Sequence, residues 1–180
     1  HGSMGNGAAM RVAPLGAHFA DDMDRLVNEA VASAEVTHAH PEGQAGAVAV
    51  PLAAAYAWLH SAVPDALGDA DLLGFVEERM PASESRDGVS RARGLPPMTS
   101  AQDAARTLGA GYKVTSQDTV PFCMWVAARY LDTFEEAVYA AVSGGGDMDT
   151  TCAIVGGIVA LAVGEVGLPQ EWLRLREPLP

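Results

Sequence analysis

The sequence predicts an all-α protein, an orthogonal multi-helix bundle that forms a single domain over residues 1–180. Apolar residues recur three and four positions apart along most of the chain, and no segment alternates apolar and polar residues as a half-buried strand does. Hydrophobic residues make up 49% of the chain and aromatic residues only 6%, which suits helices that pack closely through small side chains. A chain of 180 residues is long enough for one compact core and too short for two.

The N-terminal segment is expected to be irregular. Residues 1–16 show no helical or strand period, and several glycines and Pro14 interrupt them, which predicts a long loop. From Asp22 onward, an apolar stripe predicts a helix, and Thr37 and His38 continue that stripe.

Three different segments follow in the middle of the chain. Residues 41–62 begin with a proline and are apolar on most of their helical surface, so we expect a central helix there. Residues 72–80 predict a shorter amphipathic helix. Residues 81–97 are polar and charged and end in a glycine and two prolines, which predicts a surface loop.

Capping patterns mark the helices of the C-terminal half. Ser100 with Asp103, and Thr133 with Glu136, have the spacing of capping boxes, and each pair is expected to begin a helix. Between them, residues 120–131 predict a helix that is entered through its proline and is apolar on all sides. The last long helix is expected from about residue 150 to residue 163.

Charge and composition narrow the classes of partner. The net charge of −12 repels phosphate backbones, which argues against nucleic acid. No charged leader with an apolar core opens the chain, and the apolar run 150–164 is shorter than the roughly 18 to 20 residues of a membrane span. We therefore expect a cytoplasmic protein without a membrane partner. Cys123 and Cys152 match no zinc spacing and are expected to be buried thiols.

The segment GGGDMDTT, residues 144–151, carries the strongest chemical signal. Its glycines permit a tight turn, and Asp147, Asp149 and Thr150 then present three oxygen donors at the start of a helix. Mg²⁺ and Mn²⁺ prefer oxygen ligands, so the segment predicts part of a divalent metal site. The alternative is that Asp147 caps the helix and Asp149 favours its positive end, which requires no metal.

Two other segments carry candidate binding residues. In residues 3–7, an asparagine between two glycines, Asn6, either binds a ligand or holds a turn. His38 lies on the apolar stripe of its expected helix, where it either lines an internal cleft or is a core histidine. His38 and His40 do not suggest a transition-metal site, because no carboxylate or cysteine that could complete one is near in sequence.

Taken in order, four segments resemble the ADP-ribosylglycohydrolase family, which includes the dinitrogenase reductase-activating glycohydrolases. The segments are SMGNGAAMRVAPLG, THAHPEGQAGAVA, VPFCMWVAARYLDTFEEAVYAAV and GGDMDTTCAIVGGIVA. The resemblance implies an all-α fold around a binuclear Mg²⁺ or Mn²⁺ centre. It also implies an enzyme that hydrolyses the glycosidic bond between ADP-ribose and a protein side chain or another acceptor, with the metals lowering the pKa of a bound water.

The same resemblance implies roles for individual residues. Asp147, Asp149 and Thr150 would be metal ligands, and His38 would contact the phosphates or ribose of the ligand. The residues that would line the ADP-ribose cleft are Ser3, Met4, Gly5 and Asn6.

This chain departs from the family pattern in two ways. Met148 stands where the family usually has threonine. The family's Thr-Asp-Asp cluster and its catalytic acidic residue belong upstream of the Gly-Asn-Gly loop, so the sequence assigns no catalytic residue and lacks half of the metal ligands. Either an N-terminal segment of the same protein or a separate partner would complete the site. The alternative is a catalytically incomplete ADP-ribose-binding or structural relative.

Overall fold

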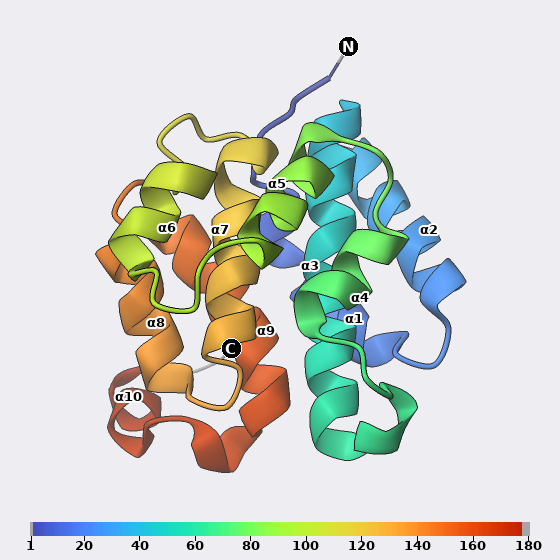
Figure 1. The fold of residues 1–180 in the computed structure, drawn as a ribbon. Coiled ribbons are helices and arrows are strands. Elements are labelled where there is room, and N and C mark those ends of the chain that lie inside the picture. Colours follow the sequence, from blue (N-terminus) through green and yellow to red (C-terminus); the bar gives the residue numbers. More distant parts are fainter. Residues whose placement is uncertain (1, 178–180) are drawn as a thin grey trace.

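The computed structural model describes residues 2–177, and over this range the chain is built from helices (Figure 1). The α-helices are Ala13–His18 (α1), Met23–Glu35 (α2), Pro41–Ala62 (α3), Leu72–Arg79 (α4), Glu84–Arg93 (α5), Ala101–Leu108 (α6), Ser116–Arg129 (α7), Phe134–Ser143 (α8), Met148–Val163 (α9) and Gln170–Leu175 (α10). Short 3-10 helices cover Ala9–Arg11 (η1), Pro64–Ala66 (η2) and Glu165–Gly167 (η3). The only strand-like pairing within residues 2–177 is an isolated bridge between Gly5 and Thr115. The predicted all-α fold is confirmed.

Helix α3 is the centre of the molecule, as its apolar surface predicts. It packs against α1, α2, α4, α7 and α9, and Figure 1 shows it beside α7 near the middle of the fold. Small residues make these contacts close: a Cβ at Gly46 would lie 2.6 Å from Ser116 Oγ. Alanine and glycine at such positions let the backbones of neighbouring helices approach each other.

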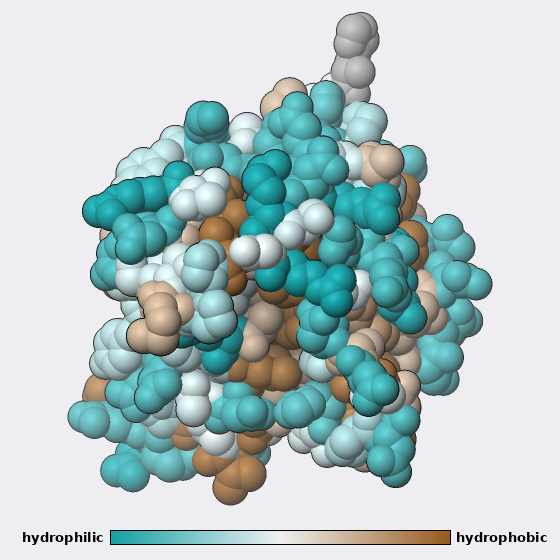
Figure 2. All heavy atoms as spheres, in the orientation of Figure 1, coloured by the Kyte–Doolittle hydropathy of each residue, from teal (hydrophilic) through white to brown (hydrophobic). Residues whose placement is uncertain are grey.

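Helix α3 also contains a longer uncharged run than the C-terminal segment considered above. By length and a mean hydropathy of 1.2, it alone among the described helices would suit a bilayer. However, 72% of its most apolar window is buried inside the protein, as in the core helix of a folded domain. Polar residues cover most of the molecular face in Figure 2, with apolar residues visible between them.

The N-terminal segment is not the long loop that its glycines predict. Residues 9–11 form η1, and α1 follows with Pro14 in its first turn, where the missing N–H costs no helical hydrogen bond. Both elements pack against α3 and α9. Helices this short contain too few turns to show an apolar period, so their tertiary contacts stabilise them.

The prediction of a surface loop over residues 81–97 is wrong, because these residues contain α5. Ser83 caps the helix by accepting a hydrogen bond from Arg86 N at 3.1 Å. Glu42 of α3 accepts further hydrogen bonds from the N–H groups of Glu84 and Ser85, at 2.7 and 3.0 Å. The buried face of α5 has helical spacing but is small and partly polar, which hid it from a search for an apolar stripe; it consists of Ser85, Gly88, Val89 and Ala92.

Two further predictions about the C-terminal half need correction. Pro121 does not begin α7 but lies inside it, against Gly88 of α5, and the helix starts at Ser116 after Thr115. Thr133 precedes α8 as predicted but makes no capping hydrogen bond to the backbone. Ser100 does cap α6, accepting from Asp103 N at 3.1 Å. Of the two cysteines, only Cys123 is fully buried.

Candidate functional site

The GGGDMDTT segment forms the turn between α8 and α9. Gly145 and Gly146 both have φ of 70°, a conformation that favours glycine. A methyl group at Gly146 would overlap the backbone carbonyl of Ala110, and a Cβ at Gly111 would lie 2.6 Å from the Cβ of Asp147. The N–H of Asp147 donates to Ala110 O at 3.0 Å. Asp147 is therefore held tightly against residues 110–111.

The N-terminal loop meets this turn although 141 residues separate Asn6 from Asp147. Asn6 Nδ2 donates to Asp147 Oδ2 at 2.7 Å and to Thr119 Oγ1 at 3.0 Å. Asn6 is only 3% exposed. Because an amide group carries two N–H protons, both are used inside the protein, and only the oxygen of the side chain stays available to a ligand.

Backbone pairing fixes the N-terminal loop against the segment before α7. Asn6 N donates to Val114 O at 3.2 Å, and Ser116 N donates to Met4 O at 2.9 Å. The hydroxyl of Ser116 adds a third hydrogen bond, to Gly5 O at 3.0 Å. The loop therefore has a defined position relative to α7.

Asp147 occupies the N-cap position of α9, but its carboxylate makes no capping hydrogen bond. Oδ2 accepts a hydrogen bond from Asn6, so Asp147 is tied to the N-terminal loop as well as standing at the start of α9. Partial burial raises the pKa of Asp147, but hydrogen bonds with Asn6, Asp149 and Thr150 lower it by more than burial raises it. Its pKa lies below the ordinary 3.8, so the carboxylate is ionised at neutral pH.

The other two predicted metal ligands differ in exposure. Asp149 lies in the first turn of α9 and is exposed, whereas Thr150 is 4% exposed. The Thr150 hydroxyl lies 3.7 Å from Met10 Sδ, a weak acceptor, and its hydrogen bond with Asp147 helps to lower the pKa of that carboxyl. Residues 2–177 contain no cluster of three or more His, Cys, Asp and Glu side chains that could hold a metal.

His38 does not lie on a helix, because α2 ends at Glu35. Its ring instead faces the N-terminal loop: a Cβ at Gly5 or at Gly7 would lie 3.2 Å from His38 Nε2. His38 Nδ1 lies 2.7 Å from Thr37 Oγ1. Burial and the nearby charge of Arg11 lower the pKa of His38 below 6.5, which favours the neutral ring at neutral pH.

The remaining predicted ligand-binding residues lie on the same loop and are open to solvent. Ser3 and Met4 are exposed and Gly5 is half-buried. The hydroxyl of Ser3 accepts a hydrogen bond from Gly5 N at 3.1 Å. Met4 lines a surface cavity of about 490 Å³ that continues from the loop toward Gln117.

The sequence analysis missed Tyr112, which lies beside the turn that residues 144–147 form between α8 and α9. This turn is called the acidic turn below. Its side chain is 75% exposed, and its hydroxyl oxygen lies 2.7 Å from where a Cβ of Gly145 would be. No local pattern singles out this tyrosine, because only the path of residues 109–115 brings it to the turn. The structure thus brings together Asn6 and Asp147, and sets His38 against the loop that carries Asn6.

Comparison with known proteins matches the sequence resemblance. The family model described as ADP-ribosylglycohydrolase covers residues 1–178. An uncharacterized protein of Archaeoglobus fulgidus is 32% identical over 170 residues, which are 93% of this chain and 52% of that protein. The chain therefore spans about half the length of this curated relative. By the extent of the family match, the chain belongs to the ADP-ribosylglycohydrolase family.

Proposed function

We propose that this chain supplies the ADP-ribose-binding loop and half of the metal ligands of a hydrolase that cleaves the glycosidic bond between ADP-ribose and an acceptor. The hydrogen bond between Asn6 and Asp147 carries this proposal. It joins the loop that the family resemblance relates to ADP-ribose with the turn that it relates to metal. Membership of the family supports a glycohydrolase-type activity.

Asp147, Asp149 and Thr150 would hold a Mg²⁺ or Mn²⁺ ion. Their oxygen-only chemistry fits such a cation, and Asn6 orients the Asp147 carboxylate through its Oδ2 atom. Bound there, the metal would polarise the reacting centre and lower the pKa of a water. Three protein oxygens fall short of an octahedral set, so the rest would come from water, substrate and an N-terminal segment of the same protein.

Electrostatics supports dependence of ligand binding on a cation. The diphosphate of ADP-ribose is anionic, whereas the chain carries a net charge of −12 and Asp147 is ionised beside the loop. Without positive charge at the turn, these carboxylates repel the ligand. The glycines around Asn6 leave the backbone of the loop open to close approach by phosphate or ribose oxygens.

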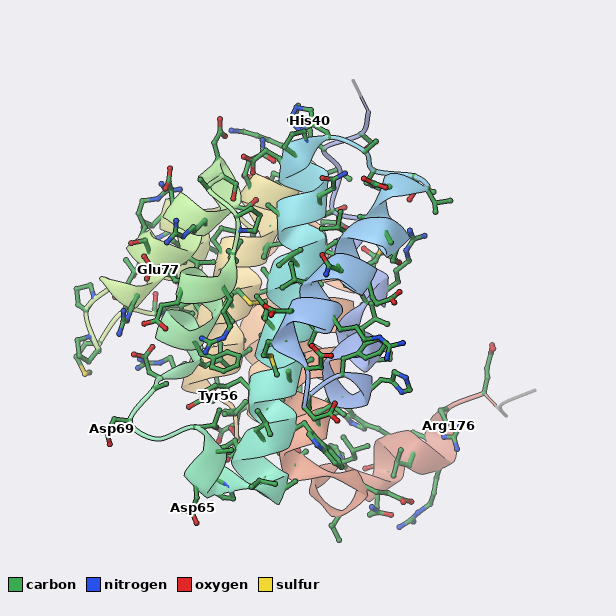
Figure 3. The ribbon with its side chains drawn as sticks, turned by 90° about the vertical axis from the view of Figure 1, so that its right-hand side faces the viewer. His40, Tyr56, Asp65, Asp69, Glu77 and Arg176 are labelled. Atoms are coloured by element: carbon green, nitrogen blue, oxygen red, sulfur yellow. The ribbon has the colours of Figure 1, made fainter. Side chains whose placement is uncertain are left out.

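Calorimetric titration of the 180-residue chain with ADP-ribose tests the binding part of the proposal. We expect Mg²⁺ to strengthen binding by about tenfold or more, because it offsets the repulsion at the turn. Asp147→Asn and Asp149→Asn should remove this enhancement. Asp65→Asn is the matched control. His40 lies at the start of α3, and Asp65 lies beyond the other end of this helix (Figure 3). Equal effects of all three substitutions would contradict the assigned metal ligands.

Release of ADP-ribose from an ADP-ribosylated protein tests the catalytic part. We expect turnover that requires Mg²⁺ or Mn²⁺ when the N-terminal segment is present. Binding of ADP-ribose without metal dependence, and without turnover in that longer protein, would instead support the second candidate, a non-catalytic ADP-ribose-binding relative. The incomplete set of metal-binding side chains within residues 2–177 is the observation that favours this candidate.

A further inference from the structure

We propose that Arg11 and Thr37 are positioning residues that hold the neutral His38 ring as its Nε2–H tautomer, with this N–H facing the loop between Gly5 and Gly7. His38 then presents a hydrogen-bond donor to an oxygen of the ligand. The identity of that ligand, ADP-ribose, rests on the proposed function. The tautomer itself rests only on contacts within this chain.

The direction of the hydrogen bonds follows from the chemistry of Arg11. Its guanidinium donates to Thr37 Oγ1 at 3.0 Å and to Ser33 O at 3.1 Å, and it has no acceptor atom. Thr37 Oγ1 is therefore the acceptor in its contact with Arg11. The hydroxyl proton of Thr37 stays available, and His38 Nδ1 lies 2.7 Å from the same oxygen.

This geometry leaves one ring nitrogen to carry the proton. If Thr37 donates to Nδ1, the neutral His38 ring must carry its proton on Nε2. In the opposite tautomer, Thr37 Oγ1 would accept from both Arg11 and Nδ1, and the hydroxyl proton of the exposed Thr37 would turn to solvent. Both tautomers keep the hydrogen bond between Nδ1 and Oγ1, so the preference for Nε2–H is that of the hydroxyl proton for Nδ1 over solvent, about two- to threefold.

The surroundings of His38 also disfavour the charged ring. Two causes lower the pKa of His38: burial, which is the larger, and the positive charge of Arg11. A neutral ring with a defined tautomer is a directional donor, whereas the charged ring would donate from both nitrogens.

The N–H at Nε2 faces a part of the loop that has no side chains to cover it. A Cβ at either Gly5 or Gly7 would lie 3.2 Å from Nε2, tighter than most contacts of a real Cβ. Asn6 lies between these glycines and donates its two amide protons to Thr119 and Asp147. His38 therefore supplies the donor that Asn6 cannot offer to a phosphate or ribose oxygen.

Nitrogen-15 NMR of the ring in the uniformly labelled 180-residue chain tests the tautomer without any ligand. Above the pKa of His38, we expect Nδ1 to be unprotonated and Nε2 to carry the proton. Thr37→Val removes the hydroxyl and should reduce the preference for this tautomer about two- to threefold. Arg11→Met should also lower the ratio of Nε2–H to Nδ1–H tautomer, and it should raise the pKa of His38. Arg11→Lys, which keeps the charge, should lie between wild type and Arg11→Met in both the tautomer ratio and the pKa. Because Thr37 and Arg11 are exposed, these variants are expected to fold.

Arg174→Met is the matched control, because it removes the same charge from an exposed position on α10. It should leave the tautomer and the pKa of His38 unchanged. A wild-type ring with the proton on Nδ1, or an unchanged ratio in Thr37→Val, would overturn the inference. Failure of ADP-ribose to bind the wild-type chain would refute the proposed function but would not alter the tautomer measured without ligand.

Discussion

Asn6 differs from an asparagine that merely forms a turn. A turn-forming asparagine bonds to its own backbone two residues on, whereas the amide of Asn6 reaches Thr119 and Asp147. Its amide group therefore joins three distant segments, and it does so at a position that is almost fully buried.

Replacing Asn6 with alanine should destabilise the protein. The substitution removes a hydrogen bond to a charged group and leaves Thr119 and Asp147 without this donor, which costs about 1 to 3 kcal/mol. It should also raise the pKa of Asp147 toward its ordinary value. Urea unfolding at neutral pH measures the loss, with the exposed Asn28→Ala on α2 as control. Equal midpoints for the two variants would contradict the structural role of Asn6.

Gly146, in the acidic turn before α9, and Gly68, between η2 and α4, differ in what surrounds them, which gives a second prediction. Gly146 and Gly68 have φ of 70° and 55°, so alanine at either costs about 1 to 2 kcal/mol of backbone strain. Only at Gly146 would the methyl group also overlap the carbonyl of Ala110, whereas nothing lies within 4 Å at Gly68. Thermal unfolding should show the larger loss for Gly146→Ala. A loss no greater than that of Gly68→Ala would mean that the turn can move away from residues 110–111.

At the scale of whole elements, the ends of helices follow local chemistry. Asp22, Asp71, Ser83 and Ser100 each accept a hydrogen bond from the N–H three residues later. This pattern is visible in a sequence because donor and acceptor are close neighbours. Helix α5 escaped prediction although Ser83 caps it, because its buried face lacks large apolar residues.

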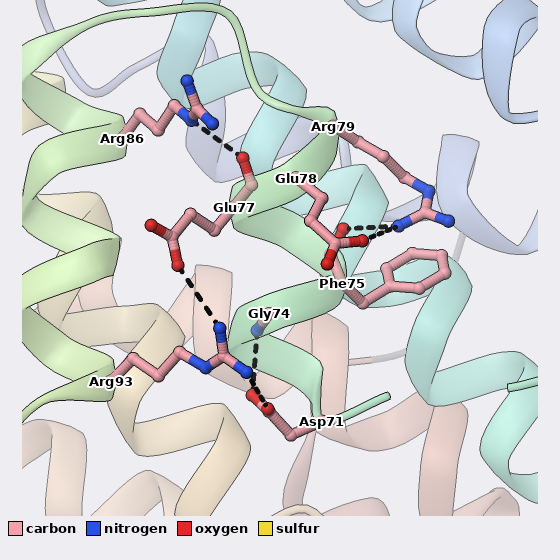
Figure 4. Close-up of polar contacts among 8 residues, drawn as sticks. All are labelled: Asp71, Gly74, Phe75, Glu77, Glu78, Arg79, Arg86 and Arg93. Atoms are coloured by element: carbon pink, nitrogen blue, oxygen red, sulfur yellow. Dashed lines mark hydrogen bonds and ion pairs between the residues drawn. The ribbon is translucent and has the colours of Figure 1, made fainter. Parts of the chain in front are cut away.

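The start of α4 provides a third prediction. Asp71 accepts from Gly74 N at 2.8 Å and from Arg93 of α5 at 2.7 Å (Figure 4). Asp71→Ala should cost about 1 kcal/mol, the usual loss for a helix cap. Arg93→Met should cost less than about 1 kcal/mol, because the ion pair is half exposed. Chemical denaturation measures both, with exposed Asp69→Ala as control, which should change stability little.

The stabilisation by Asp71 should depend on pH in a defined direction. Burial raises the pKa of Asp71, but the hydrogen bonds from Gly74 and Arg93 lower it below the ordinary 3.8. A lowered folded-state pKa means that the stabilisation is fully present above 3.8 and is lost as the pH falls through the folded value. The free energies of unfolding of wild type and Asp71→Ala should therefore converge on acidification. A constant difference across this range would contradict the ion-pairing assigned to Asp71.

At the scale of the whole molecule, the two adjacent glycines of α9 play different parts. Glycine inside a helix costs about 1 kcal/mol relative to alanine, a cost that close packing of the helix can offset. A Cβ at Gly157 would lie 2.9 Å from Ala13 Cβ of α1, whereas at Gly156 the nearest atoms, on Phe134, are 3.7 Å away. Only Gly157 is therefore required by the contact between α9 and α1.

The two glycines consequently form a matched test of helix packing. Gly156→Ala should stabilise the protein by about 1 kcal/mol, because it improves helix propensity without a clash. Gly157→Ala should show no such gain, because α1 must shift to admit the methyl group. The midpoints of thermal unfolding distinguish the two. An equal rise in both variants would show that α1 yields to the methyl group at no cost.

The sequence by itself determined the all-α class, most helix starts, the family and the oxygen-bearing turn at residues 147–150. All of these depend on residue types within a few positions of one another, through helical period, capping and turn chemistry. Tertiary structure alone decided that Asn6 binds Asp147, that His38 faces Gly5 and Gly7, and that α5 is helical. These features join residues far apart in the chain or depend on packing between helices, and no local pattern records which distant partner a side chain meets.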